Sequence, residues 1–74
     1  MLHLSRKEAA ILSKLVLPEL GEVGELDDDG RRAVANLADL EFIGVAYEGA
    51  SVRMWPTRRG KYRVLNPSRL RRPL

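Results

Sequence analysis

The stretch that decides the fold is LADLEFIGVAYEGASVRMWPTRRGKYRVL, residues 37 to 65. It begins with the apolar end of a helix, and Gly44 is placed to cap that helix before a run of apolar and aromatic residues typical of a strand. A short turn predicted at residues 48 to 51 leads into residues 52 to 55, which alternate inward and outward and pair back as a hairpin. Pro56 ends this second strand, because proline has no N–H to donate to a neighbouring strand.

The residues after the hairpin predict a third helix and a tail. Thr57 can cap a short helix that ends near Leu65, just before the next proline. The last stretch, SRLRRPL, is basic and has too little apolar content to order itself. We therefore expect one domain over residues 1 to 66 and a flexible basic tail over residues 67 to 74.

Two further helices are predicted in the first half of the chain. Ser5 and Glu8 have the spacing of a capping box, which starts a helix that ends before Pro18. A second helix begins at Asp28 or Asp29, one of which is its N-cap, because apolar residues then recur at helical spacing. The apolar positions that face the core from these two helices are Ile11, Leu12, Leu15, Val16, Ala33, Val34, Leu37 and Leu40.

The segment between these helices, PELGEVGEL, contains two glycines that break regular structure, and three consecutive acids follow it. We expect a loop there, with at most one helical turn that ends at Leu26. A calcium loop needs oxygen ligands at alternate positions and a later glutamate, a spacing that residues 27 to 32 lack. The acids instead favour the positive end of the following helix, where Asp28 can pair with Arg32 one turn later.

The composition excludes several classes of function. The 74 residues contain no cysteine, and the one histidine, His3, lies near the N-terminus. No motif places a base near a serine, and there is no glycine-rich phosphate loop. We therefore expect no enzyme, no cofactor and no metal site. The longest apolar runs fall far short of the ~20 residues that span a bilayer, so we expect a soluble cytoplasmic protein without a membrane partner.

Charge is distributed unevenly along the chain, although its net value is only +3. Residues 19 to 48 contain nine acids and two arginines, a charge of −7, whereas residues 49 to 74 contain eight basic residues and no acid, a charge of +8. Ten of the 13 basic residues are arginine, which favours bidentate contacts with phosphates and base edges. This asymmetry favours a polyanion or an acidic partner for the C-terminal end.

The order helix, loop, helix, glycine turn, two-stranded hairpin and Thr-x-x-Gly helix is that of a winged helix-turn-helix domain, a small α+β fold. Residues 37 to 65 resemble the back half of MarR-like bacterial regulators in two motifs, LEFIGV and WPTRRG. The resemblance implies a recognition helix over residues 29 to 41 and a wing tip over residues 48 to 53. Only residues 17 to 28 are available for the second helix of that family, which is therefore shortened or missing.

The resemblance and the charge distribution together predict that the chain contacts duplex DNA, as a transcriptional regulator or an architectural accessory factor. On the recognition helix, Arg31 and Arg32 have the chemistry to contact guanine, and Asn36 to contact adenine. The basic residues of the wing, the last helix and the tail are predicted to line a phosphate track: Arg53, Arg58, Arg59, Lys61, Arg63, Arg69, Arg71 and Arg72.

A second hypothesis is a winged helix that acts as a protein-interaction module. The acids at residues 27 to 29 would repel phosphate at the start of the recognition helix, and the acidic segment 19 to 29 could dock on a basic partner instead. The sequence is compatible with a homodimer but does not predict one.

Trp55 and Tyr62 allow two interpretations. Their rings could stack on the bases of a single strand, or they could fill the core beneath the hairpin. We favour the core, because few other large side chains are available in a chain of this size. Their expected core neighbours are Leu37, Leu40, Ile43 and Met54.

Overall fold

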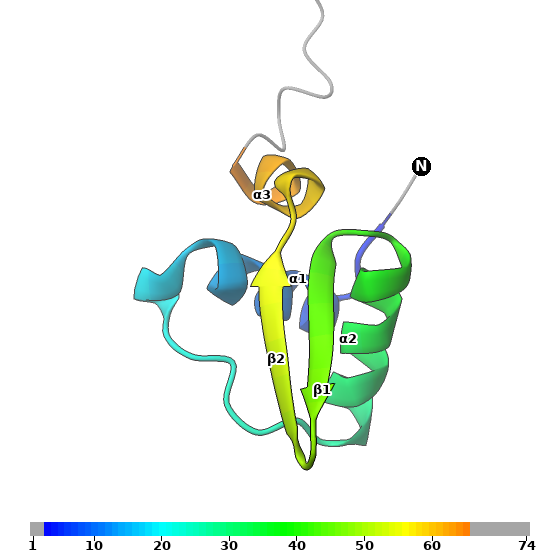
Figure 1. The fold of residues 1–74 in the computed structure, drawn as a ribbon. Helices are drawn as coiled ribbons and strands as arrows, with labels where there is room; N and C mark the ends of the chain where they lie inside the picture. Colours follow the sequence, from blue (N-terminus) through cyan, green and yellow to red (C-terminus); the bar gives the residue numbers. More distant parts are fainter. Residues whose placement is uncertain (1–2, 66–74) are drawn as a thin grey trace, which may run out of the picture.

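The computed structural model describes residues 3 to 65 and, within them, contains three α-helices, a short 3-10 helix and a two-stranded antiparallel sheet (Figure 1). In chain order the elements are α1 (Arg6–Val16), η1 (Pro18–Leu20), α2 (Asp28–Asp39), β1 (Ile43–Glu48), β2 (Ser51–Pro56) and α3 (Arg58–Leu65). This order confirms the predicted small α+β fold with the layout of a winged helix, in which the hairpin is the wing. The predicted tail at residues 67 to 74 lies outside the described residues.

α1 begins and ends as its sequence predicts. The backbone N–H of Glu8 donates to Ser5 Oγ at 3.1 Å, and the Glu8 carboxylate accepts from the backbone N–H of Ser5 at 2.9 Å, which completes the capping box. At the other end Leu17 is the C-cap, immediately before Pro18. Both ends of α1 are therefore set by local sequence.

The connection from α1 to α2 contains no full helix. Its one helical turn is η1, which starts at Pro18, so the predicted turn ending at Leu26 is wrong. Proline suits the first position of a helix because its φ is already helical and no N–H is lost there. Gly21 and Gly24 have positive φ angles of 112° and 78°, a backbone conformation that ends the turn and keeps the rest of the connection irregular.

α2 starts at Asp28, one of the two predicted positions, but its N-cap differs from the prediction. Its N-cap is Asp27, whose carboxylate accepts from the backbone N–H of Gly30 at 2.7 Å, so the prediction of Asp28 or Asp29 as the cap is wrong. Asp28 and Asp29 lie in the first helical turn instead, where their charges favour the positive end of the helix dipole. The three acids therefore act together as the start of this helix.

The end of α2 also differs from the prediction. Glu41, with a φ of 66°, takes the left-handed position that glycine usually occupies after a helix. The N–H groups of Glu41 and Phe42 donate to the carbonyls of Ala38 and Leu37, each at 2.9 Å, which is the Schellman pairing. Gly44 is therefore not a cap: it lies within β1, opposite Trp55 of β2.

The hairpin has one face toward the core and one toward solvent. β1 pairs with β2 from Ile43 opposite Pro56 to Glu48 opposite Ser51, and the two-residue turn has Gly49 at a φ of 62° in its first position, as in a type II′ turn. Ile43 is buried, and Val45 and Met54 pack against the core beside it. The residues between these positions on each strand, including Trp55, project to the other side of the hairpin, toward solvent.

A hydrogen-bonded corner joins α3 to the end of α2. Thr57 donates its backbone N–H to the Phe42 carbonyl at 3.0 Å and its hydroxyl to the Glu41 carbonyl at 2.6 Å. The same hydroxyl accepts from the backbone N–H of Gly60 at 3.1 Å, which confirms Thr57 as the cap of α3. Gly60 is buried against this corner, where a Cβ atom would collide with the Phe42 carbonyl oxygen. The Thr-x-x-Gly motif thus caps α3 and lets it approach closely.

The core lies between α1, α2 and the inner face of the hairpin. Its buried apolar residues are Ile11, Leu12, Ala33, Val34, Leu37, Phe42 and Ile43. The predicted placement of Trp55 and Tyr62 in this core is wrong, because each is 44% exposed. Leu12 and Leu37, which are almost fully buried, fill the centre that the aromatic rings were expected to occupy.

Candidate nucleic-acid interface

α3 carries four basic residues and no acid, and its cap and its glycine decide which of them face solvent. Gly60 is buried and Val64 packs against the core, so the helix turns the opposite side outward. The exposed side consists of residues at helical spacing: Arg58, Lys61, Tyr62 and Leu65. We call this side the α3 outer face.

The other two cations of α3 are held against an aromatic ring. The guanidinium carbons of Arg59 and Arg63 lie 5.4 and 5.8 Å from the centroid of the Phe42 ring, within the range of cation–π contacts. Phe42 itself is only 3% exposed, so the ring is a rigid support. This arrangement fixes two guanidinium groups beside the α3 outer face while they keep their charge.

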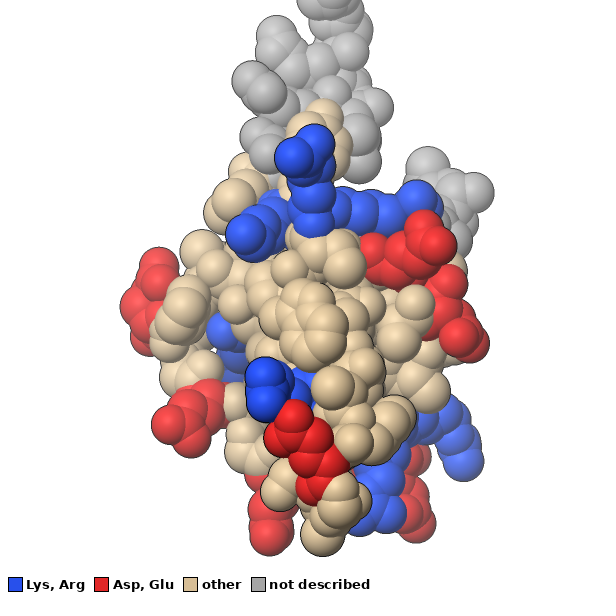
Figure 2. All heavy atoms as spheres, in the orientation of Figure 1, with Lys and Arg blue, Asp and Glu red and all other residues tan. Residues whose placement is uncertain are grey.

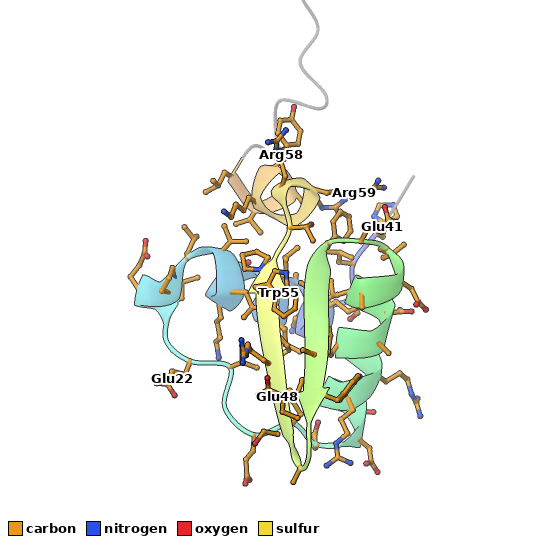
Figure 3. The ribbon with its side chains drawn as sticks, viewed as in Figure 1. Glu22, Glu41, Glu48, Trp55, Arg58 and Arg59 are labelled. Atoms are coloured by element: carbon orange, nitrogen blue, oxygen red, sulfur yellow. The ribbon has the colours of Figure 1, made fainter. Side chains whose placement is uncertain are left out.

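Figure 2 shows that Lys and Arg side chains gather at the α3 end of the molecule, with acidic side chains at their border. Figure 3 places Glu41, in the turn after α2, next to Arg59. The cluster on α3 therefore has a defined edge on the α2 side.

The basic residues predicted on α2 and on the wing do not join this cluster. Arg31 lies 4.0 Å from Asp28 and lines a hollow with Ala50 and Ser51 of the hairpin tip, which Figure 1 shows at the opposite end of the hairpin from α3. Each strand has six residues, so the tip lies roughly 17 Å from the α3 end. The residues predicted to contact DNA therefore do not form one continuous surface, because α3 lies at one end of the hairpin and Arg31 at the other.

The remaining predicted residues differ in what the structure says of them. Arg53 donates to the Glu48 carboxylate at 2.7 Å on the exposed hairpin, and Arg32 is exposed on α2 beside Asp29, near the start of α1. Three arginines of the tail, Arg69, Arg71 and Arg72, lie outside the described residues. The structure therefore brings together only the four basic residues of α3.

Asn36, predicted to contact adenine, is exposed on α2 and hydrogen-bonded to a side chain of α1. Its side-chain amide donates to Glu8 Oε2 at 2.7 Å, which links α2 to α1. Glu8 is only 8% exposed, and its other carboxylate oxygen belongs to the capping box. The Asn36 hydrogen bond, followed by the backbone N–H of Ser5, lowers the pKa of Glu8 below its ordinary value of 4.5. Asn36 therefore has a structural partner for its amide donor.

The acids at the start of α2 have structural partners as well. Asp27 lies 3.6 Å from the Lys7 ammonium and accepts from Gly30 at the helix start. The Gly30 hydrogen bond and then the Lys7 charge lower the pKa of Asp27. The acidic run is therefore explained by the start of α2 and by its contact with α1.

Across residues 3 to 65, no three His, Cys, Asp or Glu side chains are grouped so that they could hold a metal ion. In the same range no buried side-chain nitrogen or oxygen lacks a hydrogen-bond partner, and no helix is long and apolar enough to cross a bilayer.

Comparisons of the chain with protein-family models, curated proteins and solved structures found no match.

Sequence reasoning missed the exposure of Trp55 and Tyr62. The hairpin register contained a signal for Trp55, because a tryptophan paired across the sheet with a glycine can cover that glycine from outside. For Tyr62 the signal was its position four residues after Arg58, on the side of α3 opposite to Gly60 and Val64.

Proposed function

We propose that this chain is a DNA-binding winged-helix protein, a transcriptional regulator or an architectural accessory factor, that contacts duplex DNA through α3 and the basic tail. The observation that carries the proposal is the cluster of Arg58, Arg59, Lys61 and Arg63 on one short helix without an acid. The resemblance of residues 37 to 65 to MarR-like regulators supports the same class of function.

The chemistry of the cluster suits a phosphate backbone. Arginine can donate two parallel hydrogen bonds to a phosphate, and the contacts of Arg59 and Arg63 with Phe42 reduce the conformational freedom that binding would remove. The α3 outer face adds Arg58 and Lys61, which are exposed. Each phosphate that a cation neutralises releases counterions, so the affinity should fall steeply as salt rises.

In this proposal the affinity comes from backbone contacts more than from base readout. Asn36 is engaged with Glu8, and Arg31 lies beside Asp28 at the far end of the hairpin. Contacts to phosphates position a protein on a duplex without selecting a sequence. We therefore expect weak discrimination between duplex sequences.

The proposal can be tested by a gel-shift titration of the full chain with a mixed-sequence duplex. The titration is repeated over a series of salt concentrations. We expect retardation at low salt, and a straight decline of the logarithm of the affinity against the logarithm of the salt concentration with a slope of about −0.9 per neutralised phosphate. Absence of any retardation at low salt would refute DNA binding.

A second candidate function is a protein-interaction module that docks on a basic partner. The observation that favours it is the first turn of α2, where Asp28 and Asp29 are exposed. Replacing both with asparagine should abolish capture of such a partner, and the capture should survive nuclease treatment. Under this alternative, alanine at Arg58, Arg59 and Arg63 should leave partner binding intact, whereas under the first proposal it should abolish duplex binding.

A further inference from the structure

Two aromatic side chains border the basic cluster and are open to solvent. Trp55 lies on the outer side of β2 just before α3, and Tyr62 lies on the α3 outer face; each is 44% exposed. Figure 3 shows Trp55 on the front of the hairpin, below the helix from which Arg58 and Arg59 project. Neither ring fills the core, so their placement needs another explanation.

The Trp55 ring packs against a glycine and is partly open to solvent. A Cβ atom on Gly44, its partner across the sheet, would collide with Cε2, Nε1 and Cζ2 of the indole. The indole therefore packs against the bare backbone of Gly44 and still keeps 44% of its surface exposed. A ring held in this way loses little conformational freedom when a second flat group stacks on it.

Arg58 lies close in the chain to both rings. Tyr62 follows Arg58 by four residues on α3, so their Cβ atoms are about 5–6 Å apart. Trp55 precedes Arg58 by three residues, so their Cα atoms are at most about 11 Å apart. Lys61 is exposed on the same face of α3. We call Trp55, Arg58, Lys61 and Tyr62 the aromatic–basic surface.

We propose that the aromatic–basic surface binds an unpaired DNA strand, with bases stacked on Trp55 and Tyr62 and phosphates held by Arg58 and Lys61. This inference rests on the proposed function, because it uses the cations of the same α3 cluster, and it adds DNA with unpaired bases as a ligand beside the duplex. Aromatic platforms beside cations are the combination that binds single strands without sequence preference, because every base has a face that can stack. In a duplex the bases stack on one another, so a duplex would use the cations alone.

Tyr47 shows that exposure of a ring is not sufficient by itself. It is 72% exposed, but it lies near the hairpin tip, away from α3, and the nearby Arg53 is paired with Glu48. It therefore offers an aromatic group without the cluster of cations, and it supplies a matched control.

Fluorescence of the full chain gives the first test, because Trp55 is the only tryptophan. The probes are a short oligothymidylate and a mixed-sequence duplex of the same length, titrated at the same salt concentration. We expect the oligothymidylate to quench Trp55 emission and to bind more tightly than the duplex. Unchanged emission when the oligothymidylate is saturating would overturn the stacking on Trp55.

Variants give the second test. Tyr62→Ala should weaken oligothymidylate binding at least about fivefold, since stacking on an aromatic side chain contributes about 1–3 kcal/mol per base. Tyr62→Phe should retain the affinity, and Tyr47→Ala should bind as the wild type does. For Trp55 the suitable variant is Trp55→Phe, which keeps a ring over Gly44 and should reduce the affinity less than Tyr62→Ala.

The outcomes separate this inference from the proposed function. If the chain binds the duplex but Tyr62→Ala and the wild type bind oligothymidylate with equal affinity, base stacking on the aromatic–basic surface is refuted. The proposed function then stands. If neither probe is bound at low salt, both are wrong. Circular dichroism of each variant establishes that it is folded before its affinity is compared.

Discussion

Gly60 is the residue at which α3 meets the turn after α2, and a side chain cannot be accommodated there. In the interior of a helix, replacement of glycine by alanine normally stabilises by about 0.5–1 kcal/mol. Here the new Cβ would collide with the backbone carbonyl of Phe42, which cannot rotate away. We therefore expect alanine at position 60 to lower the free energy of unfolding instead of raising it.

We predict that Gly60→Ala destabilises the domain by roughly 1–3 kcal/mol, as overpacking does in other cores. The measurement is the urea midpoint, with the slope of the transition checked against the wild type. Gly30→Ala is the comparison, because its Cβ would meet Leu26 and Asp27 side-chain atoms at 3.1 and 3.2 Å, which can move. An increase in stability for Gly60→Ala would contradict the close approach of α3.

The pair of Glu8 and Asn36 links α1 to α2 through a glutamate residue that is only 8% exposed. Because the folded state lowers the pKa of Glu8, the stabilisation is present above the unfolded value of about 4.5 and is lost as pH falls through the folded pKa. Asn36 is the largest cause of that shift.

We predict that Asn36→Ala lowers the free energy of unfolding at neutral pH by about 1–3 kcal/mol, since it leaves a buried acceptor unsatisfied. The variant should also lose less stability than the wild type on acidification below pH 4.5. Urea unfolding over a series of pH values measures both effects. Glu8→Gln, which carries no charge, is the control, and equal acid dependence in wild type and Asn36→Ala would count against the link.

At the scale of elements, the start of α2 depends on one acid of three. Asp27 accepts the hydrogen bond from Gly30 and lies near Lys7, whereas Asp28 and Asp29 contribute only charge to the first turn. Specific caps generally contribute more to helix stability than exposed charges do.

We predict that Asp27→Ala lowers the melting temperature more than Asp28→Ala or Asp29→Ala. Asp27→Asn and Asp27→Ser should recover most of the loss, because both side chains can accept from the Gly30 N–H. Thermal unfolding followed by circular dichroism provides the ranking. An equal effect of alanine at all three positions would mean that the acids act through charge alone.

At the scale of the whole molecule, the basic residues of α3 and Arg31 of α2 lie at opposite ends of the hairpin. The group on α3 has no acid within the helix, whereas Arg31 and Arg53 each lie beside a carboxylate. Matched pairs of substitutions can therefore remove the same charge from either end.

We predict that Arg58→Ala with Lys61→Ala weakens duplex binding and reduces the salt slope by about 2, one unit for each lost phosphate contact. Arg31→Ala with Arg32→Ala removes the same charge from the other end and should change the slope much less. Gel shifts over a salt series give both slopes. Equal losses from the two pairs would place DNA across both ends and contradict the assignment to α3.

Local sequence predicted most of the elements because their signals lie within a few residues. The Ser5 and Glu8 capping box, the Thr57 cap and the hairpin needed no distant contact, and all are confirmed. The ends of α2 were predicted less well. Three consecutive acids compete for the N-cap position, and Glu41 adopts a backbone conformation that a glycine was expected to provide.

The candidate site was predicted in composition but not in arrangement. The sequence identified the basic residues of α3 and their lack of acids, because these are properties of a continuous segment. It could not place Arg31 at the far end of the hairpin, nor show that Asn36 is bonded to Glu8, because both facts depend on how α2 packs against distant residues.

By itself, then, the sequence determined the order of helices and strands, the caps of α1 and α3, and the basic character of the last helix. Only the tertiary structure decided which side chains are exposed. Burial depends on the faces that meet: Leu12 and Leu37 fill the centre, so Trp55 and Tyr62 remain outside, next to the cations of α3. That juxtaposition arises from the docking of α3 on the Phe42 corner, which joins residues far apart in the chain.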